Sequence, residues 1–269
     1  MPHFTVTPTG AALGARVTDI DLAKPIDADT GDRIRAAFLK HSVLLFPGQA
    51  LSKEGQVRFS HLFGPPVPHP TNTKDRDAEV PEITILSNVV EAGRAIGALG
   101  NAELDFHADL VFLYTPGSVS ILYCLETPDS GGDTYWASSY AAYDALSREM
   151  VERLRGLEVV YIHRNPSYNP DPPARHPLIC THPESGRSYL FVSPSSADSI
   201  PGMSAGEGRE LLDELLTVAT QEQFVWSHSW HAGDVVVWDN RSTLHRRDGF
   251  DESARRIMHR TQMLGPLTV

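Results

Sequence analysis

The sequence predicts a mainly β fold with decorating helices, built on a jelly-roll core of two facing sheets. Seven short segments are rich in the β-branched and aromatic residues that strands favour. They span residues 42–46, 82–86, 119–125, 157–163, 189–192, 224–230 and 234–238. Helical patterns lie before or between these segments without alternating regularly with them, which argues against a β-α-β architecture. The scattered 20 glycines and 20 prolines also suit short strands joined by turns.

The other elements follow from local patterns. Residues 28–40 and 53–62 have one apolar stripe each and are predicted to be surface helices. Ser204 and Glu207 have the spacing of a capping box, and the apolar run that follows predicts a helix that ends near Gln223. Segments 224–230 and 234–238 are expected to form a hairpin whose turn contains Gly233. The proline-rich stretches 64–71 and 165–173 are predicted to be long loops, which commonly line a site.

Length and composition restrict the possible functions. A chain of 269 residues can bury a substantial core, and we expect one domain over residues 1–269. The net charge of −11 argues against nucleic acid or an acidic membrane as a partner. The arginines between residues 241 and 260 do not change this expectation, because acidic residues interrupt them.

Cysteine usage and the N-terminus indicate the compartment. Cys124 and Cys180 lie in apolar, strand-like segments, which argues against a disulfide framework and favours two core residues in a reducing cytoplasm. The N-terminus has no recognisable signal peptide, and no apolar run approaches the ~20 residues that span a bilayer. We therefore expect a cytoplasmic protein.

Three side chains are candidate metal ligands. His107 and Asp109 are two residues apart, so in an extended segment both point to the same side. His245 is the best candidate for a third ligand, because it follows a strong strand and the turn-like sequence WDNRSTLH. Two imidazoles and one carboxylate form the facial triad of non-haem Fe(II) oxygenases, which leaves positions for a co-substrate and O₂. For the pair His107 and Asp109 alone, coincidence is an equally good interpretation.

Two further residues suit 2-oxoglutarate as the co-substrate. When its 2-oxo acid end chelates iron, its distal carboxylate needs a buried, forked and permanently charged donor, which is arginine. Arg256 follows His245 and could provide it, and the Thr134 hydroxyl could add a hydrogen bond. Taken alone, Arg256 is better interpreted as an exposed charge, and residues 131–134 are also expected to form a tight turn between strands.

These motifs together resemble the taurine dioxygenase and 2,4-dichlorophenoxyacetate dioxygenase family of Fe(II)/2-oxoglutarate-dependent oxygenases. Similar segments run almost end to end: VLLFPGQALS (43–52), HAD (107–109), ETPDSGGDTYWA (126–137), HPLICTHPESGRSYLFV (176–192), GDVVVWDNRSTLH (233–245) and ARRIMHR (254–260). The resemblance implies a double-stranded β-helix, which is a cupin-like jelly roll. It also implies Fe(II) on the three candidate ligands, 2-oxoglutarate on Thr134 and Arg256, and a substrate anion near Arg260 and His69.

The substrate end departs from the family pattern at two positions. Phe106 stands where the family usually has tryptophan, and Glu103 stands where it often has asparagine, with Asn101 nearby. Glu103 would add negative charge where an anionic substrate approaches. The candidate substrate contacts are therefore His69, Asn101, Glu103, Leu110 and Arg260. Arg260 lies four residues after Arg256, an even offset that places both arginines on one face of a strand.

The resemblance implies an enzyme that hydroxylates a C–H bond of a small organic anion and releases succinate and CO₂. The substrate would be an aryloxyalkanoate, an arylalkanoate or an alkyl sulfonate. One alternative is a desaturating or cyclising oxygenase of natural-product biosynthesis with the same iron site. Another is a non-oxidative metal-binding jelly-roll protein, since zinc also accepts two histidines and a carboxylate. We also expect a homo-oligomer, although the sequence fixes neither its size nor the substrate.

Overall fold

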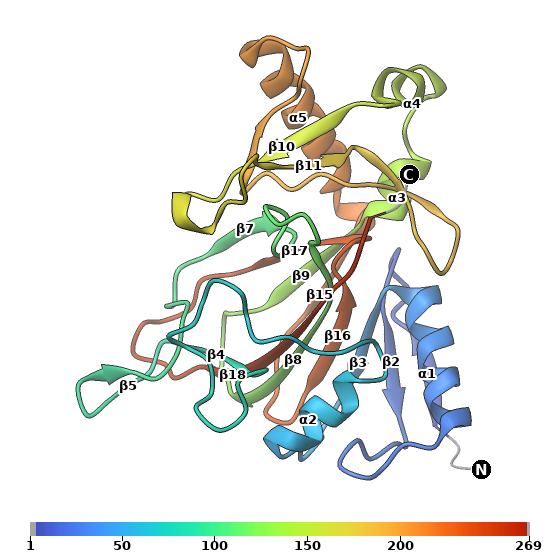
Figure 1. The fold of residues 1–269 in the computed structure, drawn as a ribbon. Coiled ribbons are helices and arrows are strands. Elements are labelled where there is room, and N and C mark those ends of the chain that lie inside the picture. Colours follow the sequence, from blue (N-terminus) through green and yellow to red (C-terminus); the bar gives the residue numbers. More distant parts are fainter. Residues whose placement is uncertain (1–3, 268–269) are drawn as a thin grey trace.

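Two β-sheets that face each other form the centre of the computed structural model, which describes residues 4–267 (Figure 1). The larger sheet has the order β1-β2-β3-β16-β8-β18-β4, in which only β2 and β3 are parallel. Its strands are β1 (Thr5–Pro8), β2 (Ala15–Thr18), β3 (Val43–Phe46), β16 (Val235–Asp239), β8 (Gly117–Glu126), β18 (Ile257–Leu264) and β4 (Thr84–Ser87). The facing sheet has the order β15 (Val225–His228), β9 (Thr134–Ser138), β17 (Thr243–Arg247) and β7 (Leu104–His107). The predicted jelly roll is confirmed.

Smaller elements surround this core. Three strands pair in the order β11 (Ala174–Pro177), β10 (Glu158–Tyr161) and β14 (Ala197–Ser199). Two further pairs are β12 (Ile179–Thr181) with β13 (Ser188–Leu190), and β5 (Val90–Glu91) with β6 (Arg94–Ala95). The 3₁₀ turns are η1 (Pro166–Tyr168) and η2 (Glu222–Phe224). Much of the predicted loop 165–173 is irregular and precedes β11.

All three predicted helices are present, and their caps explain where they begin. They are α1 (Ala28–His41), α2 (Lys53–Ser60) and α5 (Ala205–Ala219). A side-chain oxygen of the preceding Asp27, Ser52 or Ser204 accepts an N–H from the first turn, and Ser204 and Glu207 form the predicted capping box. In Figure 1, α1 lies beside β2 and β3, whereas α5 lies near β10 and β11 at the opposite end of the molecule. Sequence reasoning missed α3 (Ser139–Asp144) and α4 (Arg148–Leu154), which are too short to show a clear period.

The inner strands β3 and β16 of the larger sheet are buried on both faces. In β3, Val43 and Leu45 join the apolar cluster between the sheets, and Leu44 and Phe46 join the cluster under α1 and α2. This alternation follows the two-residue period of a strand. A third cluster packs under α5 and around β13. The predicted core residues Cys124 and Cys180 are both buried and unpaired.

The predicted hairpin of residues 224–238 is wrong. Strand β15 pairs with β9 in the smaller sheet, and β16 pairs with β3 and β8 in the larger one. Because β16 has a partner on each side, it offers no free edge to β15. The connecting segment instead crosses between the sheets. Gly233 bends this crossing with a φ of +90°, and a Cβ at that position would lie 2.9 Å from the Gln49 carbonyl oxygen.

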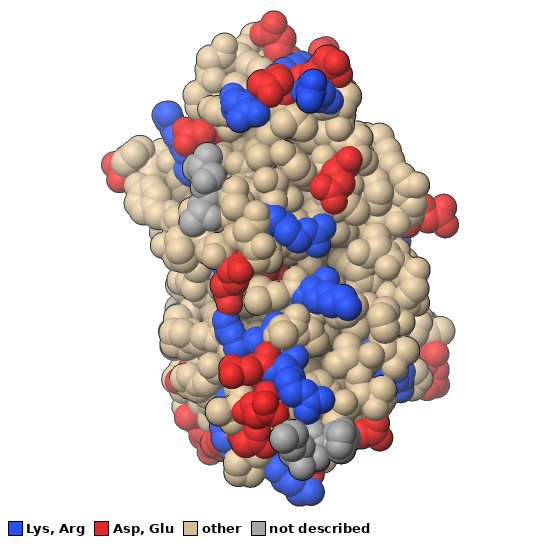
Figure 2. Space-filling view, turned by 90° about the vertical axis from the view of Figure 1, so that its right-hand side faces the viewer, with Lys and Arg blue, Asp and Glu red and all other residues tan. Residues whose placement is uncertain are grey.

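On the face shown in Figure 2, acidic and basic side chains are mixed. Within residues 4–267, every helix is too short or too polar to cross a lipid bilayer.

Candidate metal centre and the two cavities beside it

His107 and His245 are brought together by strand pairing. They lie opposite each other in the antiparallel pair of β7 and β17, and their ring centroids are 4.2 Å apart. Asp109 follows the end of β7, and its two carboxylate oxygens lie 3.8 Å from Nε2 of His107 and 3.8 Å from Nε2 of His245. In the described part of the chain, this is the only group of three or more His, Cys, Asp or Glu residues whose ligand atoms all lie within 4.8 Å of one another.

The ionisation states of these groups suit a divalent metal. Burial opposes ionisation of Asp109, but its interactions with the Arg260 guanidinium and then with His245 outweigh burial and lower the pKa of this carboxyl. Burial, followed by the nearby His107, lowers the pKa of His245 to about 3, so its imidazole is neutral at physiological pH. Metals bind carboxylates and neutral imidazoles, and two histidines with one carboxylate suit Fe(II). The residues present therefore fit the implied iron.

A second layer of side chains fixes the ligands. The backbone N–H of Asp109 donates to Asn240 Oδ1 at 2.8 Å, and Asn240 Nδ2 donates to the carbonyls of Asp109 and Gly117. Gln262 Nε2 donates to Asp109 Oδ2 at 2.8 Å. His107 Nδ1 lies 2.8 Å from the Asp105 carbonyl, to which it donates, and this leaves the lone pair of Nε2 for the metal.

The turn that carries Asn240 is itself anchored by a buried ion cluster. Asp239 accepts from His182 Nε2 at 2.7 Å and from Arg241 Nε at 3.2 Å. Burial opposes ionisation of Asp239, but Arg241 and His182 outweigh it and lower the pKa of this carboxyl. The sequence predicts a turn around WDNR, but no local pattern assigns a role to His182. Only the fold brings His182 to this turn.

We expect Asn240→Ala to weaken Fe(II) binding by about 10- to 100-fold, the usual effect of removing a group that orients a metal ligand. Asn240 is fully buried, so the change also leaves the backbone N–H of Asp109 without an acceptor. Anaerobic Fe(II) titration with a competing chelator measures the affinity, and Asn165→Ala, at an exposed asparagine, is the control. Equal Fe(II) affinity in the two variants would contradict a role for Asn240 at the metal.

One side of the metal centre opens into a small enclosed cavity rich in arginine. It is lined by His107, His245, Thr134, Trp238, Arg247, Arg256 and Arg260, among others. Arg256 is 3% exposed, and its Nε has no hydrogen-bond partner among the described residues. Burial, followed by the nearby Arg247, lowers the pKa of Arg256. A buried and uncompensated guanidinium requires an anion.

Thr134 and Arg247 also shape this cavity. Thr134 Oγ1 accepts a hydrogen bond from Trp230 Nε1 at 2.9 Å, which leaves the threonine proton free to be donated to a ligand. Arg247 was not identified from the sequence. Its Nη2 donates to the carbonyls of Gly100 and Ala102 and so holds that loop beside the cavity.

A larger, open cavity of about 300 Å³ lies on the other side of the metal centre. His69, His107, Asp109 and Leu110 line it, together with Thr71, Phe112, His163, Arg164, Ser195 and Ser196. This volume is at the lower end of the range for small-molecule sites. His163 is not among the predicted site residues. The two proline-rich stretches, 64–71 and 165–173, were the local signals in the sequence for a site here.

His69 presents a neutral imidazole to this cavity. Burial, followed by the Arg260 guanidinium, lowers the pKa of His69 to about 4. Its Nδ1 accepts the backbone N–H of Asn72 at 2.9 Å, so the ring proton is on Nε2.

Two of the candidate substrate contacts lie outside both cavities. Asn101 Nδ2 donates to the Phe250 carbonyl at 3.1 Å. Glu103 is exposed and lies 3.7 Å from Arg246 Nη1. Neither side chain lines either cavity. We therefore leave Asn101 and Glu103 out of the proposed site, and the expected negative charge in the substrate pocket is not found.

Arg260 lies between the two cavities. It lines the enclosed cavity together with Arg256, as the even offset predicted, and its Nη1 is 3.5 Å from Asp109 Oδ1. Its charge also reaches His69 in the open cavity.

Comparisons with known proteins agree with this geometry. The family described as "Taurine catabolism dioxygenase TauD, TfdA family" matches residues 5–262. An alpha-ketoglutarate-dependent 2,4-dichlorophenoxyacetate dioxygenase from Cupriavidus pinatubonensis is 36% identical over 282 residues, which cover 97% of this chain and 98% of that protein. A solved taurine dioxygenase from Burkholderia xenovorans has a TM-score of 0.86 at 33% identity, over 98% of this chain and 90% of that one.

A second solved structure bears on the ligands. AAD-2 in complex with Mn(II) and N-oxalylglycine has a TM-score of 0.82 at 30% identity, over 99% of this chain and 100% of that one. The family resemblance is confirmed, and the alternative of a non-oxidative metal-binding protein is set aside. The chain belongs to the taurine catabolism dioxygenase TauD, TfdA family, and it is an Fe(II)- and 2-oxoglutarate-dependent dioxygenase.

Proposed function

We propose that the protein hydroxylates a C–H bond of a small organic anion, of the aryloxyalkanoate, arylalkanoate or alkyl sulfonate type, and releases succinate and CO₂. The observation that carries the proposal is that His107 lines both the enclosed cavity and the open cavity. Co-substrate and substrate can therefore approach one metal from two sides. The metal, when bound, supplies the activation of O₂ and the oxidising power.

The co-substrate is assigned to the enclosed cavity. The Arg256 guanidinium can bind the distal carboxylate of 2-oxoglutarate through two parallel hydrogen bonds, and the Thr134 hydroxyl can donate a third. The binding of this dianion would neutralise the positive charge of the buried Arg256 guanidinium. The protein thus orients the co-substrate and excludes water from it.

The substrate is assigned to the open cavity. Leu110 and Phe112 give it an apolar wall, which suits an aryl or alkyl group. The protonated Nε2 of His69 can donate a hydrogen bond to a carboxylate or sulfonate, and Arg260 can supply the charge. The related proteins that act on 2,4-dichlorophenoxyacetate and on taurine support a carboxylate or sulfonate substrate.

A substrate screen tests this proposal. Purified protein with Fe(II), 2-oxoglutarate and O₂ is offered 2,4-dichlorophenoxyacetate, phenylpropionate and taurine, and succinate formation is compared with the substrate-free rate. Hydroxylation predicts that one ¹⁸O atom from ¹⁸O₂ enters the organic product. A product that has lost two hydrogens and gained no oxygen would instead support the desaturating or cyclising alternative.

Arg260→Ala should weaken substrate binding far more than 2-oxoglutarate binding, because the substrate anion loses its ionic partner. Substrate-free decarboxylation should persist, since it requires only metal, O₂ and the keto acid. Separate titrations of the two ligands under anaerobic conditions measure both affinities. Arg260 also lines the cavity of Arg256, so a loss confined to 2-oxoglutarate would reassign it to the co-substrate.

A further inference from the structure

The four tryptophans of the chain form one aromatic cluster that begins at the metal centre. Trp238 contacts His245, with ring centroids 5.0 Å apart. Trp136 lies 5.9 Å from Trp238, and Trp226 stacks on Trp136 at 5.3 Å with an interplanar angle of 22°. Trp230 lies to one side, 6.4 Å from Trp136. Tryptophan is among the most easily oxidised side chains, so a continuous series of such rings can carry electrons.

Strand register sets this arrangement. Across the smaller sheet, His107 lies opposite His245, His245 lies opposite Trp136, and Trp136 lies opposite Trp226. Residues paired in this way have their side chains side by side on one face. These four side chains form a row that crosses the sheet from β7 at one edge to β15 at the other. Trp238 from the facing sheet packs against this row.

The inner tryptophans have an unusual environment. Trp136 and Trp238 are 0% and 2% exposed, and their indole N–H groups find no acceptor among the described residues. Buried N–H groups without partners are uncommon and call for an explanation. An oxidised indole that cannot release its proton stays a radical cation, which keeps a high potential and draws an electron from the next ring. The inner rings would therefore pass the oxidised state outward and not trap it.

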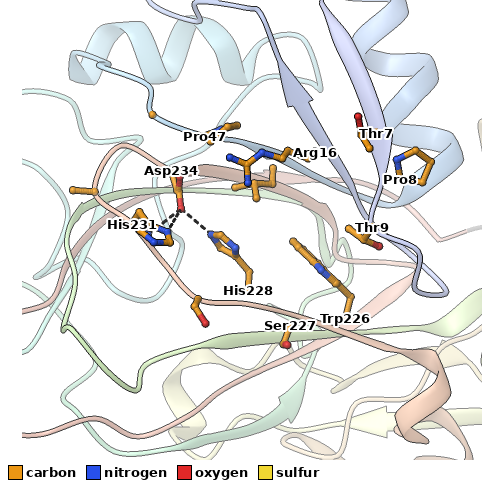
Figure 3. Close-up of a pocket in the computed structure, with 14 residues that line it drawn as sticks. Thr7, Pro8, Thr9, Arg16, Pro47, Trp226, Ser227, His228, His231 and Asp234 are labelled. Atoms are coloured by element: carbon orange, nitrogen blue, oxygen red, sulfur yellow. Dashed lines mark hydrogen bonds and ion pairs between the residues drawn. The ribbon is translucent and has the colours of Figure 1, made fainter.

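The outer end of the row reaches a surface groove of about 690 Å³ (Figure 3). Trp226 is half-buried there and stacks on His228, with centroids 5.9 Å apart. Arg16 lines the same groove and can attract a small anion, while His228 and His231 pair there with Asp234. An oxidised Trp226 can also release its indole proton to solvent there.

We propose that Trp238, Trp136 and Trp226 form an electron relay that discharges the oxidant produced at the metal when no substrate consumes it. In each step the oxidant gains one electron from Trp238 and one proton from solvent. Trp136 then gives an electron to the oxidised Trp238, and Trp226 gives one to the oxidised Trp136. The oxidised Trp226 loses a proton to solvent. A small anionic one-electron reductant such as ascorbate then returns one electron and one proton to Trp226. The relay would thus protect the metal centre from oxidative damage.

The test compares Trp226→Phe with Trp226→Tyr. Both keep an aromatic ring on Trp136, but only tyrosine can be oxidised in place of tryptophan. Tyr143→Phe, which removes an oxidisable ring on α3 outside the row, is the control. Each protein is given Fe(II), 2-oxoglutarate and O₂ without substrate. Freeze-quench EPR then follows aromatic radicals, peptide mass spectrometry locates oxidised residues, and inactivation is counted per succinate formed.

If the relay operates, the Trp226→Phe enzyme should lose activity after severalfold fewer succinate molecules than wild type. Its Trp136 and Trp238 should accumulate oxidation products. Trp226→Tyr should restore the lifetime and show a tyrosyl EPR signal. Ascorbate should extend the life of wild type and of Trp226→Tyr, but much less that of Trp226→Phe. If Phe and Tyr at position 226 give the same lifetime and the same oxidation map, the tryptophans are packing residues and the proposal is wrong.

Discussion

Replacing His107, Asp109 or His245 with alanine should abolish Fe(II) binding and turnover while the fold survives. The three ligand atoms lie within 4.8 Å of one another, and two ligands alone provide neither the charge balance nor the facial geometry of the site. The backbone at these positions is held by strand pairing and by the hydrogen bond from the Asp109 N–H to Asn240, so the jelly roll should remain intact.

Two measurements check this result. Wild type with Fe(II) and 2-oxoglutarate under anaerobic conditions should show the weak visible charge-transfer band of the chelate, and the variants should not. His61→Ala, which removes an exposed histidine, is the control. Circular dichroism should show a folded protein in every case. If a variant keeps both the band and full activity, the substituted residue is not a metal ligand.

The three variants should differ in the stability of the metal-free protein. Asp109→Ala leaves the buried Arg260 without its carboxylate partner, which costs about 1–3 kcal/mol. The histidine variants leave Asp109 paired with Arg260, so they strand no partner charge. Thermal unfolding without metal should therefore rank Asp109→Ala as the least stable of the three.

The sequence predicted the parts of the fold and site that depend on local pattern. The core strands are short apolar runs rich in β-branched and aromatic residues, and the helix α5 has a recognisable capping box at its start. The metal ligands could be found because two of them are two residues apart in sequence and the third follows a recognisable strand and turn. The family resemblance then gave Thr134 and Arg256.

What the sequence missed depends on tertiary contacts. Nothing in segments 224–230 and 234–238 indicates that each prefers a different sheet, because both have the composition of a strand. His182 reaches Asp239 across 57 positions, a contact that no local pattern reports. Arg247 looks like one more charge in an arginine-rich segment, and only burial reveals its place beside the co-substrate cavity. Glu103 stays a prediction from the family pattern, because its side chain lines neither cavity.

Arg256→Lys should raise the KM for 2-oxoglutarate by about 10- to 100-fold, although the positive charge is kept. A planar guanidinium can bind the distal carboxylate through two parallel hydrogen bonds, whereas an ammonium makes a single point contact. Each charge-assisted hydrogen bond contributes about 1.5–3 kcal/mol, and about 1.4 kcal/mol is a factor of ten in affinity. The shorter lysine also has to bury a strongly hydrated ammonium in the enclosed cavity.

The neighbouring residue provides a matched control. Arg255 is exposed and pairs with Glu126 at 2.7 Å, so Arg255→Lys makes the same chemical change one position away and outside the cavity. It should leave the KM for 2-oxoglutarate unchanged. Steady-state succinate formation gives KM, and anaerobic titration of the visible band gives the affinity directly. Because the second measurement involves no turnover, a parallel rise in both constants assigns the effect to binding. If Arg256→Lys and Arg255→Lys titrate alike, the distal carboxylate is held elsewhere, and the buried Arg247 and Arg260 become the candidates to test.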